Sequence, residues 1–315
     1  MNRSPNDEVC KVCESTEGYD RVFERLDKCR SCGFITFHGS SQDAPSSLYD
    51  EDYFAGGEYP DYLGQQDALR RSMRRHLKQM ARYHPNRGSL LEVGSAYGLF
   101  LDEAKGHFES VAGIDICEGP TAYARERLGL NVECREFEER DFGSNRVDIV
   151  CFWDTVEHLA APEVYLKKCA TLLNKDGMVF LTTGDIGSLN ARFRRARWRQ
   201  IHPPSHLHYF SRVTITRLFN RLGFEVVGIE TTSYYHTLFN VLASIRLREG
   251  LGGWLASTAL RMIRENPARR LGFWINLGDI MFVAARLKNS ASDQSNTSEP
   301  GSEGTSGNSS LLAEF

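Results

Sequence analysis

Short apolar runs of strand length alternate along the chain with stretches of helical periodicity. The runs that we expect to form strands are Leu90–Val93, Val111–Ile114, Val132–Cys134, Val147–Phe152, Met178–Thr183, Phe224–Ile229 and Ile280–Arg286. Between them, a segment with helical periodicity begins at Leu99, and two more cover Pro120–Leu128 and Pro162–Leu173. Strands and helices in alternation are typical of an α/β fold, here a doubly wound sheet with helices on both faces.

A glycine-rich turn follows the first of these strands. Gly94 and Gly98 lack a Cβ atom, so the backbone there can pass close to a ligand. Asp115 ends the second strand, where its carboxylate is placed to accept hydrogen bonds from both ribose hydroxyls of an adenosine. Because ligands of open α/β sheets bind at the carboxyl ends of the strands, the pattern predicts a nucleotide-type ligand at this edge.

The two ends of the chain differ from this α/β segment. Residues 237–277 carry apolar stretches broken by arginines, which predict a helical insertion or lid. From residue 289 the chain is rich in Ser, Gly, Glu and Asn, so we expect a disordered tail over 289–315. The organisation that we expect is a metal-binding module over 1–42, a linker with a helix over 43–80 and the main domain over 81–288.

The eight cysteines fall into two groups. The first group is Cys10, Cys13, Cys29 and Cys32, and its C-x2-C-x15-C-x2-C spacing predicts a four-cysteine zinc site. Four thiolates leave no open position for water, so such a zinc ion would be structural. Two disulfides or four free thiols are the alternatives, and disulfides fit poorly with a chain that shows no export signal. The second group is Cys117, Cys134, Cys151 and Cys169, which we expect to be small apolar residues.

Charge and hydropathy narrow the class of protein. Lys and Arg number 38 and Asp and Glu 41, a net charge of −3, which argues against a protein whose main task is to bind nucleic acid through a basic surface. No run approaches the roughly 20 apolar residues that span a membrane, and the N-terminal residues are polar. We therefore expect a cytoplasmic protein of unknown oligomeric state.

The glycine-rich turn also carries a family resemblance. It reads Glu92-x-Gly94-x-Ala96-x-Gly98, with an acid before the glycines instead of the G-x-G-x-x-G of nicotinamide dehydrogenases. This order resembles motif I of class I S-adenosylmethionine (SAM)-dependent methyltransferases. The segments VAGID with Asp115, EFEE with Phe137 and CFWDTVEH are similar to further segments of that family, and the resemblance runs from about residue 75 to 288. Ala96 departs from the family's usual glycine by one methyl group.

The resemblance implies a Rossmann-like sheet whose last strand runs antiparallel. It also implies the SAM-binding residues, which are Glu92, Gly94, Ala96, Tyr97, Gly98, Asp115, Ile116, Phe137, Trp153 and Asp154. With the cysteine module in front, the chain looks like bacterial methyltransferases that carry an N-terminal zinc ribbon and act on sugars, surface glycans or secondary metabolites. In the linker, Tyr53 and Phe54 either fold over the cofactor mouth or only anchor the linker to the domain.

Two places carry candidate bases for a hydroxyl or acidic-carbon acceptor. The first is Asp154-Thr-Val-Glu157-His158, where His158 is a candidate base, with a local hydrogen-bonding role as the alternative. Glu157 has the D-x-x-E spacing of a helix cap after Asp154, and we expect it to be a cap or a hydrogen-bond organiser. The second is the loop around His206 and His208, which two prolines make rigid. We predict His206 as the base or orienting group there, with His208 lining the acceptor site; zinc binding by this pair is the alternative.

Arginine runs precede the histidine loop and occupy the linker helix. Such runs are usually solvated helix faces, but Arg197 is also a candidate contact for a phosphate group of the acceptor. The predicted function is SAM-dependent methylation of a small-molecule or carbohydrate-type acceptor: a glycan, a nucleotide- or lipid-linked sugar, or a secondary metabolite. The alternatives are an RNA methyltransferase with a zinc ribbon and a non-catalytic SAM-binding partner protein. Weak contact of 237–277 with a membrane surface is a further hypothesis.

Overall fold

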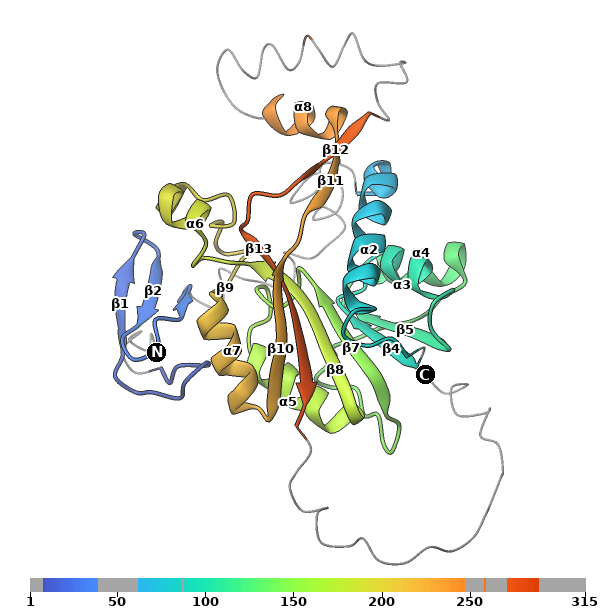
Figure 1. The fold of residues 1–315 in the computed structure, drawn as a ribbon, viewed down its shortest axis with the longest axis horizontal. Coiled ribbons are helices and arrows are strands. Elements are labelled where there is room, and N and C mark those ends of the chain that lie inside the picture. The colour runs from blue at the N-terminus through green and yellow to red at the C-terminus, as the bar shows by residue number, and fades with distance from the viewer. Residues whose placement is uncertain (1–7, 39–61, 87, 247–257, 259–270, 289–315) are drawn as a thin grey trace, which may run out of the picture.

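The computed structural model describes residues 8–38, 62–86, 88–246, 258 and 271–288 (Figure 1). A seven-stranded sheet lies at the centre, in the order β10-β13-β8-β7-β4-β5-β6. Its strands are β4 (Ser89–Val93), β5 (Ser110–Asp115), β6 (Asn131–Cys134), β7 (Val147–Trp153), β8 (Leu173–Gly184), β10 (Phe224–Thr231) and β13 (Ile280–Leu287). Each strand predicted from the sequence lies within one of them.

The direction of the strands matches the expected topology. Strands β6, β5, β4, β7 and β8 pair in parallel, whereas β13 runs antiparallel to both of its neighbours, β8 and β10. The chain passes outward from β4 to β5 and then returns to place β7 on the other side of β4. This reversal beside β4 is the switch point at which doubly wound sheets bind ligands.

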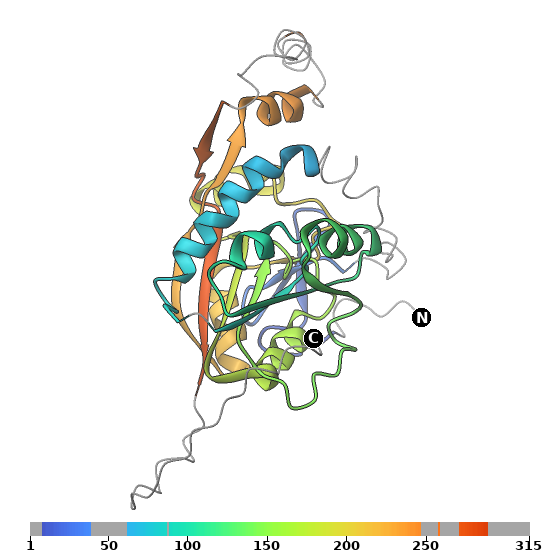
Figure 2. The ribbon, with the colours of Figure 1, turned by 90° about the vertical axis from the view of Figure 1, so that its right-hand side faces the viewer.

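Helices cover both faces of the sheet (Figures 1 and 2). They are α2 (Gln66–Met80), α3 (Leu99–Ala104), α4 (Glu118–Leu128), α5 (Pro162–Leu172) and α7 (Arg212–Arg221). Outside these two layers, α6 (Leu189–Arg194) packs on the small sheet of the N-terminal module and α8 (Leu238–Arg246) follows β11, and there are short 3-10 turns η3 (Leu63–Gln65) and η4 (Arg195–Arg197). Alternate residues of β7 divide between two cores: Val150 and Phe152 pack with α5 and α7, and Ile149 and Cys151 pack with α2 and α3. The predicted α/β architecture with two helical layers is confirmed.

The N-terminal module is joined to the main domain through one small sheet. Its strands β1 (Tyr19–Val22), β2 (Leu26–Cys29) and β3 (Ile35–Thr36) are extended by β9 (His208–Tyr209), which follows α6 and η4 in the chain. On β3, Ile35 pairs with Tyr209 and Thr36 with His208, antiparallel. The main domain therefore supplies the fourth strand, and that strand belongs to the predicted histidine loop.

Side chains reinforce this junction. Phe34 packs on Phe210 with ring centroids 5.2 Å apart. Arg221, at the end of α7, donates through Nε to the carbonyl of Val12 at 3.0 Å and through a terminal nitrogen to the carbonyl of Lys11 at 2.6 Å. The turn between Cys10 and Cys13 is thus fixed by an arginine of the main domain.

A β-arm extends beyond the carboxyl ends of the parallel strands. It consists of β11 (Tyr234–Thr237) and β12 (Gly272–Ile275), paired antiparallel, with α8 following β11 directly (Figure 1). The segment 237–277, predicted to be helical, therefore contains one described helix but ends in a strand. The rest of that segment, Tyr53 and Phe54 of the linker, and the tail over 289–315 lie outside the described residues.

The linker helix α2 is held against the main domain by its arginines. Arg70 forms ion pairs with Asp102 at 2.6 Å and Glu103 at 3.1 Å, and Arg74 pairs with Glu103 at 2.5 Å. Their neighbour Arg71 lies over the ring of Tyr235 on β11. This run therefore makes intramolecular contacts, where the sequence had indicated a solvated face or a phosphate contact. Across the described ranges, none of the helices has the length and apolar character that crossing a bilayer demands.

Candidate active site

The turn after β4 has the backbone geometry of a ligand cradle. Gly94 and Gly98 adopt φ values of +77° and +70°, and Ala96 between them adopts +46°, which is rare for a residue with a side chain. A Cβ on Gly94 would lie 2.6 Å from Thr155 Oγ1, so only glycine lets this turn approach β7 so closely. The predicted glycine pair is thus required by the geometry, and Ala96 tolerates its strained conformation.

Asp115 holds that turn in place from the end of β5. Its Oδ2 accepts a hydrogen bond from the amide of Ala96 at 2.8 Å, and its Oδ1 accepts one from the amide of Cys117 at 2.9 Å. Burial raises the pKa of Asp115, while these amides act in the opposite direction. Ile116, the next residue, is 41% exposed, so its side chain is accessible to a ligand at the end of β5.

Two polar groups under the turn are buried without hydrogen-bond partners among the described residues. They are Oε2 of Glu92 and the hydroxyl of Ser95. Burial, with a smaller contribution from the charge of Asp115, raises the pKa of Glu92 well above its ordinary value. An unpartnered buried carboxyl is costly, and a cationic group of a ligand would supply the missing partner.

Tyr62 lies over the mouth of this site, a position that the sequence did not reveal. Its ring stacks on Tyr97, with centroids 5.3 Å apart and planes at 24°. Burial and then the charges of Glu92, Asp115 and Asp154 raise the pKa of Tyr62. An aromatic residue of the linker therefore does cover the predicted cofactor region, but it is Tyr62, and Tyr53 lies outside the described residues.

Asp154 directly follows β7 and is the first of several polar residues near the turn. It adopts a φ of +48°, and Tyr234 of β11 donates to its Oδ2 at 2.5 Å. Thr182 of β8 donates to its Oδ1 at 2.9 Å. Burial raises the pKa of Asp154, and the hydroxyls of Tyr234 and Thr182 act against that rise. Tyr234 has no motif around it, so only the fold brings it to this carboxylate.

Two of the predicted cofactor residues are mainly core residues. Trp153 stacks on His76 of α2 with ring centroids 4.7 Å apart and contacts Phe100 at 5.0 Å. Phe137 is 2% exposed, and its ring lies 5.5 Å from that of Tyr165 on α5. Packing explains both side chains without a ligand, and their contact with a cofactor stays a prediction.

The predicted bases His158 and His206 lie together. Their ring centroids are 4.6 Å apart in an edge-to-face arrangement, and His202 lies 3.8 Å from His206. Burial lowers the pKa of His158 to about 4 and that of His206 to about 2, so both rings are neutral at pH 7. Two segments that are 48 residues apart in the chain thus form one imidazole cluster.

Glu157 is part of the same cluster and is not a helix cap. The chain after Asp154 forms a turn, and α5 begins only at Pro162. The carbonyl of Glu157 accepts the amides of Leu207 and His208 at 2.9 and 3.1 Å, which holds the histidine loop against β7. Its side chain is 3% exposed, and burial followed by the charge of Asp154 raises its pKa to about 8.

His208, predicted to line the acceptor site, lies at the junction with the N-terminal module instead. Its Nδ1 shares a hydrogen bond of 2.9 Å with the hydroxyl of Thr36, and its ring packs on Phe34 and Phe210. The side chain is 3% exposed. Because β9 pairs with β3, alternation along the strand directs His208 into this interface.

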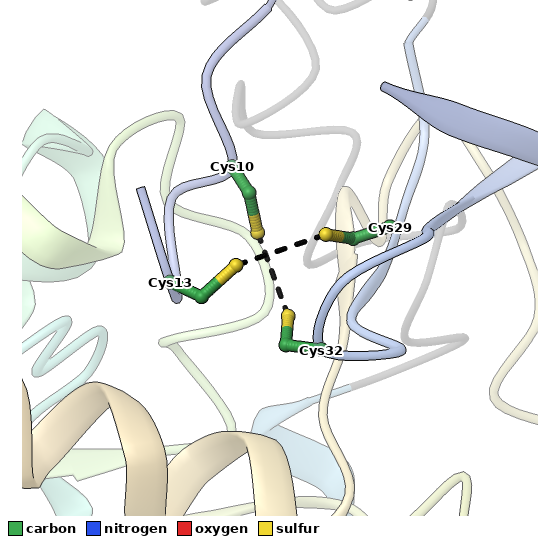
Figure 3. Close-up of side chains that lie close together, drawn as sticks. All are labelled: Cys10, Cys13, Cys29 and Cys32. Carbon is green, nitrogen blue, oxygen red and sulfur yellow. Dashed lines mark hydrogen bonds between the residues drawn. The ribbon is translucent and has the colours of Figure 1, made fainter. Parts of the chain in front are cut away.

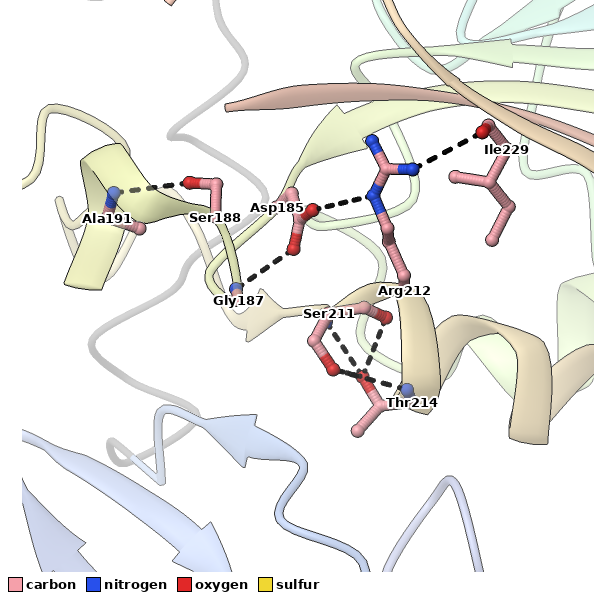
Figure 4. A network of polar contacts seen from close by, with 8 residues as sticks. All are labelled: Asp185, Gly187, Ser188, Ala191, Ser211, Arg212, Thr214 and Ile229. Atoms are coloured by element: carbon pink, nitrogen blue, oxygen red, sulfur yellow. Dashed lines mark hydrogen bonds and ion pairs between the residues drawn. The ribbon is translucent and has the colours of Figure 1, made fainter. Parts of the chain in front are cut away.

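A polar network fixes the segments on either side of the histidine loop (Figure 4). Asp185, directly after β8, accepts from Nε of Arg212 at 3.1 Å and from the amide of Gly187 at 2.9 Å. Ser211 caps α7 by accepting from the amide of Thr214. Arg197 lies on η4 with its side chain exposed, so its predicted contact with an acceptor stays a prediction.

The four N-terminal cysteines converge on one point (Figure 3). Cys10 Sγ lies 3.6 Å from Cys32 Sγ, and Cys13 Sγ lies 3.8 Å from Cys29 Sγ. A tetrahedral zinc ion about 2.3 Å from each sulfur sets the sulfurs about 3.8 Å apart, whereas a disulfide needs about 2.05 Å. The cysteines are free, and a hydrogen bond from Cys32 lowers the pKa of Cys10 to about 4 while burial raises that of Cys29. A central cation would let all four ionise.

Comparisons with known proteins agree with this geometry. The profile of a family described as a methyltransferase domain matches residues 65–229. The ubiquinone biosynthesis O-methyltransferase of Coxiella burnetii (strain Dugway 5J108-111) is 28% identical over 99 residues, which are 30% of this chain and 42% of that protein. The enzyme of the same name from Bradyrhizobium diazoefficiens is 29% identical over 99 residues, 30% of this chain and 39% of its own length. The matched region thus spans less than half of these relatives.

Solved structures show the same fold at low sequence identity. The complex between the Haloferax volcanii Trm112 methyltransferase activator and the putative methyltransferase gives a TM-score of 0.50 at 13% identity. That likeness covers 72% of this chain and 93% of the compared chain. At this identity it concerns the fold alone.

Proposed function

Because the match over residues 65–229 covers more than half of the chain, this chain belongs to the methyltransferase domain family, and we propose a small-molecule or carbohydrate-type methyl acceptor for it. The chain is a SAM-dependent methyltransferase with a Rossmann-like sheet. The observation that carries the proposal is the cluster of polar side chains that Asp154, Glu157 and the imidazoles form after β7, near the glycine-rich turn. A cluster of hydrogen-bond acceptors on the carboxyl edge suits a hydroxyl-bearing molecule.

The residues of the turn fit SAM. Asp115 would accept from the ribose, and the exposed Ile116 would lie against the base. The unpartnered carboxyl of Glu92 would meet the cationic end of the molecule, and Tyr62 with Tyr97 would cover it. SAM, when bound, supplies an electrophilic methyl carbon, and Asp154, His158 and His206 would lie on the side from which an acceptor approaches.

On the acceptor side the chain's residues align the nucleophile and receive its proton. Asp154, held by Tyr234 and Thr182, would orient an acceptor hydroxyl. His158 and His206 are neutral at pH 7 and so can accept a hydrogen bond from an acceptor hydroxyl. To take its proton as a general base, the acting ring would need a pKa in the ligand complex that is raised toward the working pH. Arg197, exposed ahead of the histidine loop, is proposed as a contact for an anionic group on the acceptor.

We further propose that the N-terminal cysteines hold a structural zinc ion. The sulfur separations match a tetrahedral site, and the short strands around them have little core of their own. With four thiolate ligands the ion has no open position, so its role is to fold the module and not to activate the acceptor.

The name of the relatives favours oxygen as the methylated atom, since they are O-methyltransferases. RNA is the alternative acceptor, because a zinc ribbon also accompanies that activity; the net charge of −3 argues against it. The test is replacement of His158 or His206 by alanine. Turnover should fall by about 100-fold or more if the cluster acts on the acceptor, with the Kd for SAM unchanged. Unchanged turnover in both variants would contradict the assignment.

A further inference from the structure

Three side chains near the proposed acceptor site have the composition and placement of a metal-ligand set. Glu157, His158 and His206 each contribute one ligand atom, and these atoms lie within 4.8 Å of one another. Sequence alone gave no third ligand, because it paired His206 with His208. In the structure, His208 points into the interface with the N-terminal module, and the residues that lie beside His206 are Glu157 and His158.

The hydrogen bonds of the two rings decide which nitrogen carries the lone pair. Nδ1 of His158 lies 2.9 Å from the carbonyl of Ser205, and Nδ1 of His206 lies 3.0 Å from the carbonyl of Gln200. A carbonyl only accepts, so each neutral ring donates from Nδ1 and has its lone pair on Nε2. Metal-binding histidines are oriented in this way, by a bond from the other ring nitrogen to a backbone carbonyl.

The carboxyl group of Glu157 gives an independent sign that a ligand is missing. Its side chain is 3% exposed, and its Oε2 has no hydrogen-bond partner among the residues that the structure describes. Burying an ionised carboxyl without a partner is expensive, and buried charges are normally paired or bound to a metal. The ion pairs of the described residues leave this carboxyl out, so a cation at the cluster would satisfy it.

The backbone of the site is fixed before any ion arrives. The Glu157 carbonyl accepts two amides of the histidine loop, and the hydroxyl of Tyr209 donates to the carbonyl of His206 at 3.0 Å. An ion with ligands about 2.0–2.2 Å away needs donor atoms about 3–3.5 Å apart, so separations of up to 4.8 Å must close by up to about 1.8 Å when the ion binds.

We propose that Glu157, His158 and His206 bind one divalent transition-metal ion of the zinc class, separate from the four-cysteine site. Two imidazoles and one carboxylate favour zinc over magnesium, which prefers oxygen ligands. Three protein ligands leave a position open, unlike the four cysteines, so an acceptor oxygen can occupy it. The binding of the ion does not depend on the proposed function; only its role beside the acceptor rests on it. With both Nε2 lone pairs on the ion, His158 and His206 would act as ligands and not as bases, and the ion would lower the pKa of an acceptor hydroxyl in their place.

The test counts zinc in the full chain. Wild type, Glu157→Gln, His206→Asn and the exposed control His107→Ala are equilibrated with Zn²⁺, exchanged into metal-free buffer and compared by native mass spectrometry and by titration. Wild type and the His107 control should hold two ions. The two ligand variants should hold one, with affinity for the second reduced by about 100-fold or more. Mn²⁺ should bind the second site more weakly than Zn²⁺, and Mg²⁺ more weakly still.

One ion in wild type, or the same two affinities in all four proteins, would overturn the inference. So would a second site that takes Mg²⁺ in preference to Zn²⁺. Circular dichroism checks that each variant is folded, and His158→Asn replaces any variant that is not. A wild-type protein that binds two ions and SAM but methylates nothing would overturn the proposed function and leave the metal site standing.

Discussion

At the scale of single residues, the site combines burial with missing partners. Glu92 and Glu157 are each 3% exposed, and each has one carboxylate oxygen without a partner among the described residues. Buried acids that serve only packing are normally satisfied by hydrogen bonds. The charged neighbour of Glu92 is Asp115, on the proposed cofactor side, and that of Glu157 is Asp154, on the proposed acceptor side.

The buried carboxyl of Glu92 leads to a prediction about both the stability of the protein and its binding of SAM. Its folded-state pKa is raised above the unfolded value, so its contribution to stability is present at low pH and lost as pH rises through the folded pKa. Glu92→Gln should therefore raise the melting temperature of the SAM-free protein at pH 8 and change it little at pH 4. The same variant should weaken SAM binding by about 10- to 100-fold, the loss of a charge-assisted hydrogen bond.

Scanning calorimetry at the two pH values and isothermal titration with SAM measure these effects. If Glu92→Gln lowers the melting temperature at pH 8 and binds SAM as wild type does, then the buried carboxyl serves packing only.

The hydrogen bond from Tyr234 to Asp154 leads to a second prediction at the scale of single residues. The Tyr234 hydroxyl donates to Asp154 at 2.5 Å, so Tyr234→Phe leaves that carboxylate with the Thr182 bond alone. We expect kcat to fall by about tenfold, with the Kd for SAM within a factor of about three. The neighbouring Tyr235→Phe is the matched control, because its ring contacts Arg71 and Trp274 instead. Equal kcat values for the two variants would remove Tyr234 from the acceptor site.

At the scale of elements, the histidine loop connects the two proposed metal sites. Strand β9 pairs with β3 of the N-terminal module, and the preceding residues reach Glu157. Strands of two residues are weak on their own, so the loop depends on the module for its position.

Removing a zinc ligand from the module should therefore loosen the loop. In Cys32→Ser, amide hydrogen exchange over residues 202–209 should accelerate by at least about tenfold, because local opening there costs less free energy. Cys134→Ser, outside the cluster, is the control and should leave these amides protected. Unchanged exchange in Cys32→Ser would show that the loop is held by the main domain alone.

Sequence patterns located the sheet and the glycine-rich turn because their signals are local. An apolar run such as Val147–Phe152 predicts a strand from its own residues alone. Gly94 is likewise needed by the turn in which it lies, so its signal is also local. Tyr62, Tyr234 and the β3–β9 pairing carry no such signal, since they depend on contacts between distant segments. For Glu157 the sequence predicts a helix cap or a hydrogen-bond organiser, and it cannot separate the two because D-x-x-E spacing fits a turn as well as a helix start.

At the scale of the whole molecule, the module, the sheet and the β-arm meet around one edge. The parallel strands end there, β9 brings the histidine loop from the side of the module, and β11 brings Tyr234 from the arm (Figure 1). A site assembled from so many segments is suited to select an acceptor, because each segment contributes a different contact.

The most direct measurement is methyl-label transfer from SAM by the purified full-length protein into cell extract separated into RNA, lipid and polar fractions. We predict label in a small-molecule, glycan or lipid-linked sugar product, reduced by about 100-fold or more in His206→Ala and retained in His107→Ala. Label confined to RNA would contradict the proposed acceptor. Absence of label from every fraction, with SAM binding intact, would contradict methyl transfer to any acceptor of the proposed class.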